Sequence, residues 1–251
     1  MHPTICTIGP FTLYSYGAMV ALGSLVCLFG VLREAARGGI KSAIFYDLYF
    51  WILISGLIGA RLVYILTNLR FFLEEPVEIF MIQHGGLSWF GGFFFGFLAV
   101  VLLVKKNKLS FFQIADIFAP YLALGQAIGR LGCLLNGCCY GRPSNFPFAL
   151  VLPGHQERLY PTQLYSFFAL LLIFALLALF KKRKGIVTGQ VFSLYLVLYG
   201  LKRFILELFR GDIILTAFFN LSLFQIFALV EMAAGIILYS RLSKRRFRGK
   251  I

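Results

Sequence analysis

Seven long apolar runs constrain the fold of this chain more than any other feature, because a helix of about 20 apolar residues is long enough to cross a lipid bilayer. Their approximate bounds are 11–32, 44–67, 86–104, 110–130, 162–180, 189–209 and 223–240. The first run is longer than the apolar core of a cleaved signal peptide and no Lys or Arg precedes it. We therefore expect an all-α polytopic membrane protein with seven transmembrane helices, forming a single integral membrane domain over residues 1–251.

Composition excludes a water-soluble globule, since 60% of the 251 residues are hydrophobic and only 14% are charged. The net charge of +14 comes mainly from Lys and Arg in one alternate set of connections and in the C-terminal tail. The opposite set carries only Arg70, Arg142, Arg158 and Arg210. The positive-inside rule then places the N terminus outside and the C terminus in the cytoplasm, where basic residues can contact anionic membrane lipids. This distribution explains the charge without nucleic acid.

Four basic residues lie inside the apolar runs: Arg61, Arg130, Lys202 and Arg203. An ionisable group at that depth costs at least about 2.5 kcal/mol, so each is a functional candidate. The structural alternative is an arginine that ties helices together through a Glu or through carbonyl groups. Lys202 could also extend to the membrane interface.

The unusual residues gather at the outer ends of the expected helices, which disfavours a receptor or transporter with a site at mid-membrane. One helical stripe, with spacings of four, four and three, consists of Tyr199, Arg203, Glu207 and Arg210. It indicates either an internal Arg203–Glu207 pair or a guanidinium that binds a phosphate, and we favour the phosphate site. The longest outer connection, 131–161, is expected to cover this end, and its Asn136 and glycines suggest a turn that lines a ligand.

At these positions the sequence resembles the phosphatidylglycerol prolipoprotein diacylglyceryl transferases of the bacterial inner membrane. The matching segments are IGPFTLYSYG (8–17), GARLVYIL (59–66), GGLSWFGG (85–92), SFFQIADIFAP (110–120), GRLGCLLNGCCYGRPSNFPFAL (129–150), YPTQLY (160–165) and GLKRFILELFRGD (200–212). The resemblance implies a multi-pass enzyme of the bacterial inner (cytoplasmic) membrane. Its substrates would be phosphatidylglycerol and the signal peptides of prolipoproteins. The reaction would transfer the diacylglyceryl group to the lipobox cysteine thiol, forming a thioether and releasing glycerol phosphate.

Residue by residue, the resemblance implies that Arg130 and Arg203 are catalytic, because cationic donors would stabilise the departing phosphate. The expected substrate-binding residues are Tyr16, Arg61, Asn136, Gly141, Tyr199, Glu207 and Arg210. No cofactor is expected.

The chain departs from the family pattern where a histidine is often proposed as the base, because Phe90 stands there. Tyr160 replaces a second family histidine. Cys133 and Cys138 replace polar residues of the family signature, which is the segment 129–150. Phosphate binding is therefore expected to persist, while the proton acceptor is not identified; His84 could serve only if the start of its helix unwinds. The alternative function is a catalytically altered paralogue that binds anionic phospholipid or lipoprotein precursors.

Three of the five cysteines, Cys133, Cys138 and Cys139, cluster in the signature. Their spacing lacks a paired C-x-x-C arrangement and no histidine adjoins them, so we expect no metal. A disulfide and a nucleophilic cysteine that accepts the lipid transiently are the other possibilities. We favour reduced thiols that fill space.

Overall fold

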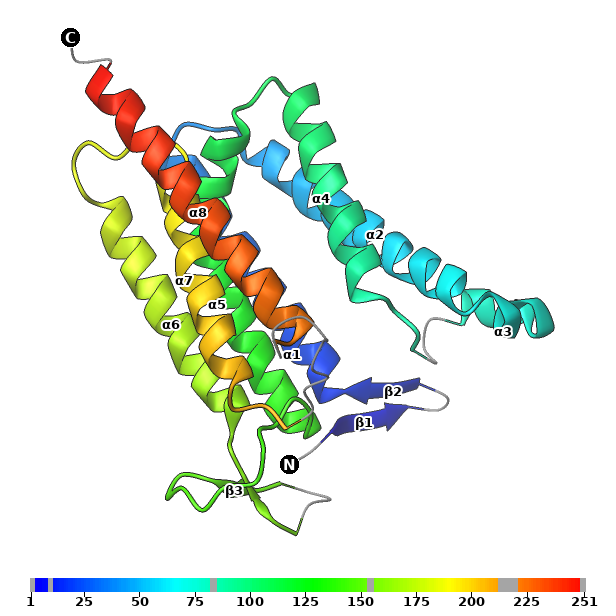
Figure 1. Ribbon diagram of the computed structural model, residues 1–251. Helices are drawn as coiled ribbons and strands as arrows, with labels where there is room; N and C mark the ends of the chain where they lie inside the picture. The colour runs from blue at the N-terminus through cyan, green and yellow to red at the C-terminus, as the bar shows by residue number, and fades with distance from the viewer. Residues whose placement is uncertain (1–2, 9–10, 82–84, 153–155, 212–220, 249–251) are drawn as a thin grey trace. The chain divides into compact units, whose positions relative to one another are not determined.

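The computed structural model describes residues 3–8, 11–81, 85–152, 156–211 and 221–248. Its helices are α1 (Ser15–Arg37), α2 (Ser42–Thr67), α3 (Leu69–Glu74), the 3₁₀ helix η1 (Pro76–Phe80), α4 (Trp89–Lys106), α5 (Phe111–Asn136), α6 (Thr162–Lys181), α7 (Gln190–Glu207) and α8 (Leu223–Arg248). Two antiparallel hairpins accompany them: β1 (Thr4–Ile8) with β2 (Phe11–Tyr14), and β3 (Leu150–Val151) with β4 (Arg158–Leu159). Figure 1 shows the order of these elements.

The helical, membrane-spanning character is confirmed, since six helices are long and apolar enough to cross a membrane: α1, α2, α4, α5, α6 and α8. The seventh expected span, α7, does not meet that criterion, and it carries Lys202, Arg203 and Glu207. The first span was placed too early, because residues 11–14 form strand β2. That segment, Phe-Thr-Leu-Tyr, consists of residues that favour strands and pair well with β1.

Two compact units make up the chain, one of residues 1–31 and 115–251 and the other of residues 32–114. In the second unit, α2 and α4 pack closely because glycines face each other. A Cβ on Gly91 would overlap the carbonyl oxygen of Gly59, and a Cβ on Gly59 would lie 2.5 Å from the Cβ of Phe95. Small residues of this kind allow the backbones of membrane helices to approach.

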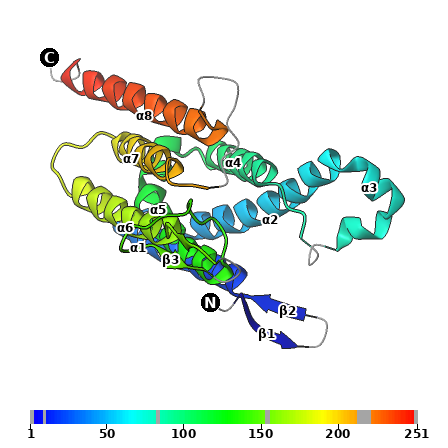
Figure 2. The same cartoon turned by 60° about the horizontal axis from the view of Figure 1, so that its bottom comes forward.

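The first unit packs α1 against α5 in the same way, since a Cβ on Gly23 would lie 2.6 Å from the carbonyl oxygen of Gly125. Its core combines alanines of α5 with large apolar residues of α6 and α7, including Ala123, Leu170 and Val191. Helix α7 contacts both α6 and α8 (Figures 1 and 2). The predicted stripe is only partly helical, because α7 ends at Glu207 and Arg210 lies beyond it, where it forms a bridge with Gly141.

Asp116, a residue that the sequence analysis did not single out, fixes the start of α7. Its buried carboxylate on α5 accepts hydrogen bonds from the backbone N–H groups of Gly189, at 2.6 Å, and Phe192, at 2.7 Å. The first N–H groups of a helix have no partner within the helix, so this carboxylate replaces the missing acceptors. It also shows that buried polar residues are not confined to the end of the bundle that holds the signature.

We predict that Asp116→Ala destabilises the protein by about 1–3 kcal/mol, because two buried N–H groups lose their acceptor. For a chain of this length that is a fall in melting temperature of about 2–4 °C per kcal/mol. Thermal unfolding in detergent measures it, with Asp116→Asn as the matched control, since the amide oxygen retains one acceptor. An alanine variant as stable as the original chain would contradict this role.

Candidate active site

The end of α5 is a tight turn that determines where the signature residues lie. Gly137 has φ +71°, its N–H donates to the carbonyl of Leu134 at 3.2 Å, and the N–H of Cys138 donates to the carbonyl of Cys133 at 3.1 Å. This is the Schellman pattern, in which the third residue from the helix end and the second residue after it approach each other. The helix therefore continues to Asn136, so the outer connection begins at Gly137 rather than at residue 131.

The turn brings the three signature cysteines together. The sulfur atoms of Cys133, Cys138 and Cys139 all lie within 4.8 Å of one another, and the Sγ atoms of Cys138 and Cys139 are 3.7 Å apart. Two side chains at the start of α6 hold the backbone of the turn: Gln163 donates to the carbonyl of Cys138 at 2.7 Å and Thr162 to that of Cys139 at 2.6 Å. The sequence already placed these cysteines in one segment, and its Asn136-Gly137 pair is a signal for the helix end that brings their sulfur atoms together.

The two thiols beyond the helix end have opposite electrostatic environments. Hydrogen bonding with Cys133, supported by Cys138 and by the charges of Arg130 and Arg210, lowers the pKa of Cys139 to about 5. Burial and the neighbouring Cys139 raise the pKa of Cys138. One sulfur of the cluster is thus favoured as a thiolate.

The two predicted catalytic arginines lie in the same unit as this turn and close enough to each other for their charges to interact. Arg130, near the end of α5, makes no hydrogen bond or ion pair with any residue that the structure describes. Arg203 pairs with the buried carboxylate of Glu207 at 3.3 Å, and its guanidinium lies 4.4 Å from the ring centre of Phe224. Glu207 also accepts a hydrogen bond from Ser222 at 3.0 Å.

Lys202 does not extend to an interface as suggested, because it is buried and its Nζ lies 4.1 Å from the ring centre of Tyr199. Tyr199 also stacks on Tyr195 at 5.6 Å. Glu231 of α8, which the sequence analysis did not single out, is close enough for its charge to act on Lys202. The cationic group is therefore larger and deeper than the predicted stripe.

Gly141 joins the outer connection to the end of α7. Its N–H donates to the carbonyl of Tyr160 at 2.9 Å, it forms a bridge with Arg210, and the N–H of Arg142 donates to the carbonyl of Phe209 at 2.9 Å. A Cβ at position 141 would lie 2.6 Å from the carbonyl oxygen of Phe209. Only glycine fits this approach, which places Arg210 beside the cysteine turn.

Two other predicted substrate-binding residues adjoin the turn. Tyr16 starts α1 next to Gly132, is 45% exposed and lies near Arg130 and the cysteines. Asn136 is exposed at the last helical position of α5, and its side chain hydrogen-bonds with Cys138. The structure therefore groups Tyr16, Arg130, Asn136 and Arg210 around one helix end.

Arg61 belongs to the other unit, where it makes the carbonyl contacts named as the structural alternative. Its guanidinium donates to the carbonyls of Ile79 at 3.2 Å, Gly85 at 2.6 Å and Gly86 at 3.0 Å, and also to those of Glu78 and Met81. All its donor nitrogens are used. A part in substrate binding stays a prediction, and these contacts indicate that it would be indirect. His84 lies outside the described residues.

Comparison with known proteins gives a consistent result along the chain. Residues 3–241 match the family described as prolipoprotein diacylglyceryl transferase. The chain belongs to this family. The phosphatidylglycerol–prolipoprotein diacylglyceryl transferases of Clostridium tetani and Finegoldia magna are both 34% identical to it, over 84% and 92% of this chain and 86% and 91% of their own lengths. The enzyme of the same name from Staphylococcus aureus is 31% identical over 96% of this chain and 90% of its own.

The departures from the family pattern fall on defined elements of this family member. Phe90 lies in the first turn of α4 and is exposed, stacking edge-on against Trp89 at 5.3 Å. Cys133 and Cys138 form two of the three corners of the sulfur cluster. The side chains of these two cysteines thus lie close together, although they are five residues apart.

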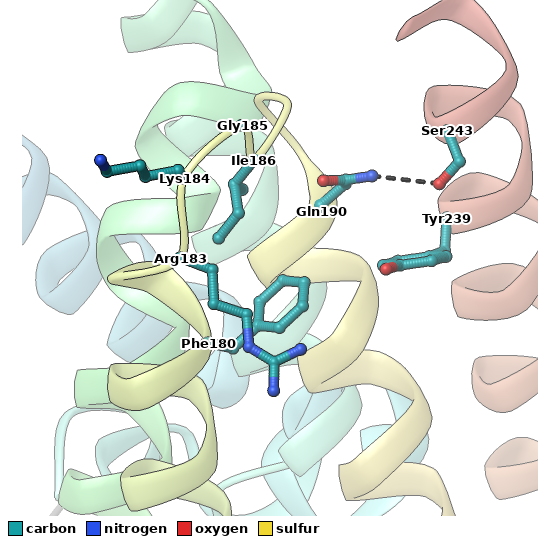
Figure 3. Close-up of a pocket in the computed structure, with 8 residues that line it drawn as sticks. All are labelled: Phe180, Arg183, Lys184, Gly185, Ile186, Gln190, Tyr239 and Ser243. Atoms are coloured by element: carbon teal, nitrogen blue, oxygen red, sulfur yellow. Dashed lines mark hydrogen bonds between the residues drawn. The ribbon is translucent and has the colours of Figure 1, made fainter. Parts of the chain in front are cut away.

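A separate cavity of about 210 Å³ lies at the other end of α6 and α7 (Figure 3). Arg183 and Lys184 line it beside Phe180 and Tyr239, and Gln190 donates to Ser243 at 3.0 Å across it. None of the predicted site residues contributes to this cavity, so we assign it no part in the family reaction.

We predict that Gly141→Ala destabilises the protein by about 1–3 kcal/mol, because the new methyl group overlaps the carbonyl of Phe209. Gly129→Ala is the matched control, since a Cβ there meets nothing within 4 Å and alanine favours a helix. Thermal unfolding in detergent compares the two. Equal stability of both variants would argue against the close approach at Gly141.

Proposed function

We propose that this protein transfers the diacylglyceryl group of phosphatidylglycerol to the cysteine thiol of a prolipoprotein, with release of glycerol phosphate. The observation that carries the proposal is the cationic group at the end of α5 and α7 in a chain of the transferase family. Sulfur attack on the glyceryl carbon expels a phosphate monoester, so the reaction needs cationic donors where negative charge grows.

The charges at this place favour an anion. Among the described residues, Arg203 lies close enough to Arg130, Lys202 and Arg210 for their charges to interact, and the carboxylates that act on Lys202 and Arg203 are Glu231 and Glu207. Arg130 makes no hydrogen bond or ion pair with any described residue. A phosphate would satisfy its guanidinium donors.

Distinct roles follow for the surrounding residues. Arg130 and Arg203 would hold the phosphate, and Glu207 would fix the orientation of Arg203 through their pair. The substrate-binding positions are Tyr16, Asn136, Gly141, Tyr199 and Arg210, with Arg61 in a supporting role in its own unit. The internal pair and the phosphate site, which the sequence analysis treated as alternatives, are thus compatible.

The alternative is a paralogue that binds anionic phospholipid or a lipoprotein precursor without transfer, which the altered signature and Phe90 favour. Incubation of the purified protein with phosphatidylglycerol and a lipobox peptide, followed by mass spectrometry of the peptide thiol, separates the two functions. Transfer adds a diacylglyceryl group to the cysteine peptide and none to its Cys→Ser counterpart. Lipid or peptide binding with an unmodified thiol supports the paralogue.

For the membrane arrangement, we infer seven spans, an outer N terminus, a cytoplasmic C terminus and residence in the bacterial inner membrane. Helix α7 contacts α6 and α8, both of which can span, and its charged residues have partners within the protein. Because the three charged residues of α7 have partners within the protein, they do not prevent α7 from spanning the membrane. The signature turn would then face the outer side.

We predict that Arg130→Lys and Arg203→Lys each lower turnover by about tenfold or more, because an ammonium cannot reproduce bidentate guanidinium contacts worth about 1.5–3 kcal/mol. The transfer assay, at equal protein levels, measures the loss. Arg70→Lys is the control, since Arg70 is exposed and pairs only with nearby Glu74 at 3.4 Å. Unchanged turnover in both site variants would remove these arginines from the mechanism.

The topology predicts opposite labelling of two reporter thiols in a cysteine-free variant. Asn145→Cys in the outer connection should react with an impermeant reagent added to intact cells, and Ser243→Cys on α8 should react only after lysis. Labelling of Ser243→Cys from outside would overturn the orientation.

A further inference from the structure

The three sulfur atoms of the α5 turn have the spacing of a metal site. Zinc–sulfur bonds of about 2.3 Å at tetrahedral angles separate neighbouring sulfurs by about 3.8 Å. The Sγ atoms of Cys138 and Cys139 are 3.7 Å apart, and all three lie within 4.8 Å of one another. A disulfide would join only two of the three.

The backbone that carries these thiols is held independently of the sulfur atoms. The Schellman pattern at Gly137 fixes the approach of Cys133 and Cys138, while Gln163 and Thr162 hold the carbonyls of Cys138 and Cys139. Ligands mounted on a fixed backbone lose little freedom when they bind a metal. The thiol side chains themselves remain available.

The surrounding charge also fits a zinc–thiolate group. Three thiolates and one Zn²⁺ carry a net charge of −1, which is costly near a membrane unless cations adjoin it. Arg130 and Arg210 both act on Cys139. These two arginines would compensate the anionic cluster.

The cluster supplies three ligands, and among the described residues no fourth cysteine or acidic side chain joins it. Cys133 is buried, whereas Cys138 and Cys139 are half-buried, so the open side faces the end of the helix. Zinc sites with three protein ligands and a fourth position for water or substrate are the catalytic type. The acceptor substrate of the proposed reaction is itself a thiol.

We propose that Cys133, Cys138 and Cys139 bind one Zn²⁺ whose fourth ligand is the acceptor thiol of the prolipoprotein, an inference that rests on the proposed function. On binding, the acceptor thiol gives its proton to water and becomes a thiolate. The sulfur of this thiolate then forms a bond to the glyceryl carbon of phosphatidylglycerol. The bond between that carbon and the phosphate oxygen breaks, and the electron pair of the broken bond stays on the oxygen of the departing glycerol phosphate. The product thioether is neutral and a weaker ligand, so it dissociates.

This site would generate the thiolate without a protein base. The position at which relatives are expected to have a histidine is Phe90, and zinc would replace that function by direct coordination. The three cysteines act in this mechanism as ligands and accept no lipid.

Metal content is the first test. Protein purified under reducing conditions should contain about one zinc per chain. It should lose the zinc in Cys133→Ser, Cys138→Ser and Cys139→Ser and keep it in Cys27→Ser, whose thiol lies outside the cluster. The cobalt-substituted protein should show sulfur-to-cobalt charge-transfer absorption. Absence of both zinc and this absorption, or an isolated disulfide within the cluster, overturns the proposal.

Binding of the acceptor thiol is the second test, and it does not depend on turnover. A lipobox peptide should change the visible spectrum of the cobalt protein, and its Cys→Ser counterpart should not. An unchanged spectrum with the cysteine peptide overturns the fourth-ligand role, whether or not transfer occurs.

Transfer by the zinc-free variants completes the test. A free thiol with a pKa of about 8.5 is only a few per cent ionised at pH 7, so zinc removal should lower the rate by up to roughly 30-fold. The deficit should shrink as the pH approaches 8.5. Full transfer without zinc at pH 7 overturns this inference and leaves the proposed function intact. If the zinc-loaded protein transfers nothing, the proposed function fails, and the cobalt spectra alone decide the metal site.

Discussion

A peptide group that leaves helical geometry and is buried away from water must find its hydrogen-bond partner within the protein. The end of α5 meets this requirement through backbone hydrogen bonds at Gly137, through Gln163 and Thr162 of α6, and through the contacts of Gly141 with Tyr160 and the end of α7. The same contacts place the cysteines, Arg130 and Arg210 around one point. The contacts that satisfy the backbone hydrogen bonds at the end of α5 therefore also position the residues of the candidate site.

The second constraint is that a buried arginine needs a partner of opposite charge. Glu207 supplies this partner to Arg203 and leaves some of the guanidinium donors for a ligand. The carboxylate is almost fully buried, and its pair with Arg203 and hydrogen bond from Ser222 compensate its burial. A guanidinium has donors on three nitrogens, so a contact through one of them leaves others for a ligand. Glu207 can therefore orient Arg203 while other donors of the same guanidinium remain for a ligand. Arg61 shows the opposite case, because carbonyl groups occupy all its donor nitrogens.

The functional part of Tyr16, Arg130, Arg203 and Arg210 stays a prediction, whereas the sequence was sufficient to predict most of the apolar helices, because apolar length is a local property. It did not predict the β1–β2 hairpin or the contact of Asp116 with the start of α7, since both depend on pairing between segments. The absence of a metal, which the cysteine spacing predicts, stays a prediction. The spacing rule considers ligands that are paired closely in sequence, whereas here a helix end folds Cys133 back onto Cys138 and Cys139.

The sulfur cluster and the arginines are chemically complementary in a reaction that needs both an activated nucleophile and a stabilised leaving group. Arginines alone would lower the energy of the departing phosphate but would leave the acceptor thiol largely protonated at neutral pH. A zinc–thiolate group alone would activate sulfur but would repel the anionic lipid headgroup. Beside the cysteine turn, Arg130 and Arg210 would balance the charge of the proposed zinc–thiolate group and would also attract the phosphate. Arg130 and Arg210 could serve both groups, because both lie close enough to Cys139 for their charges to act on it.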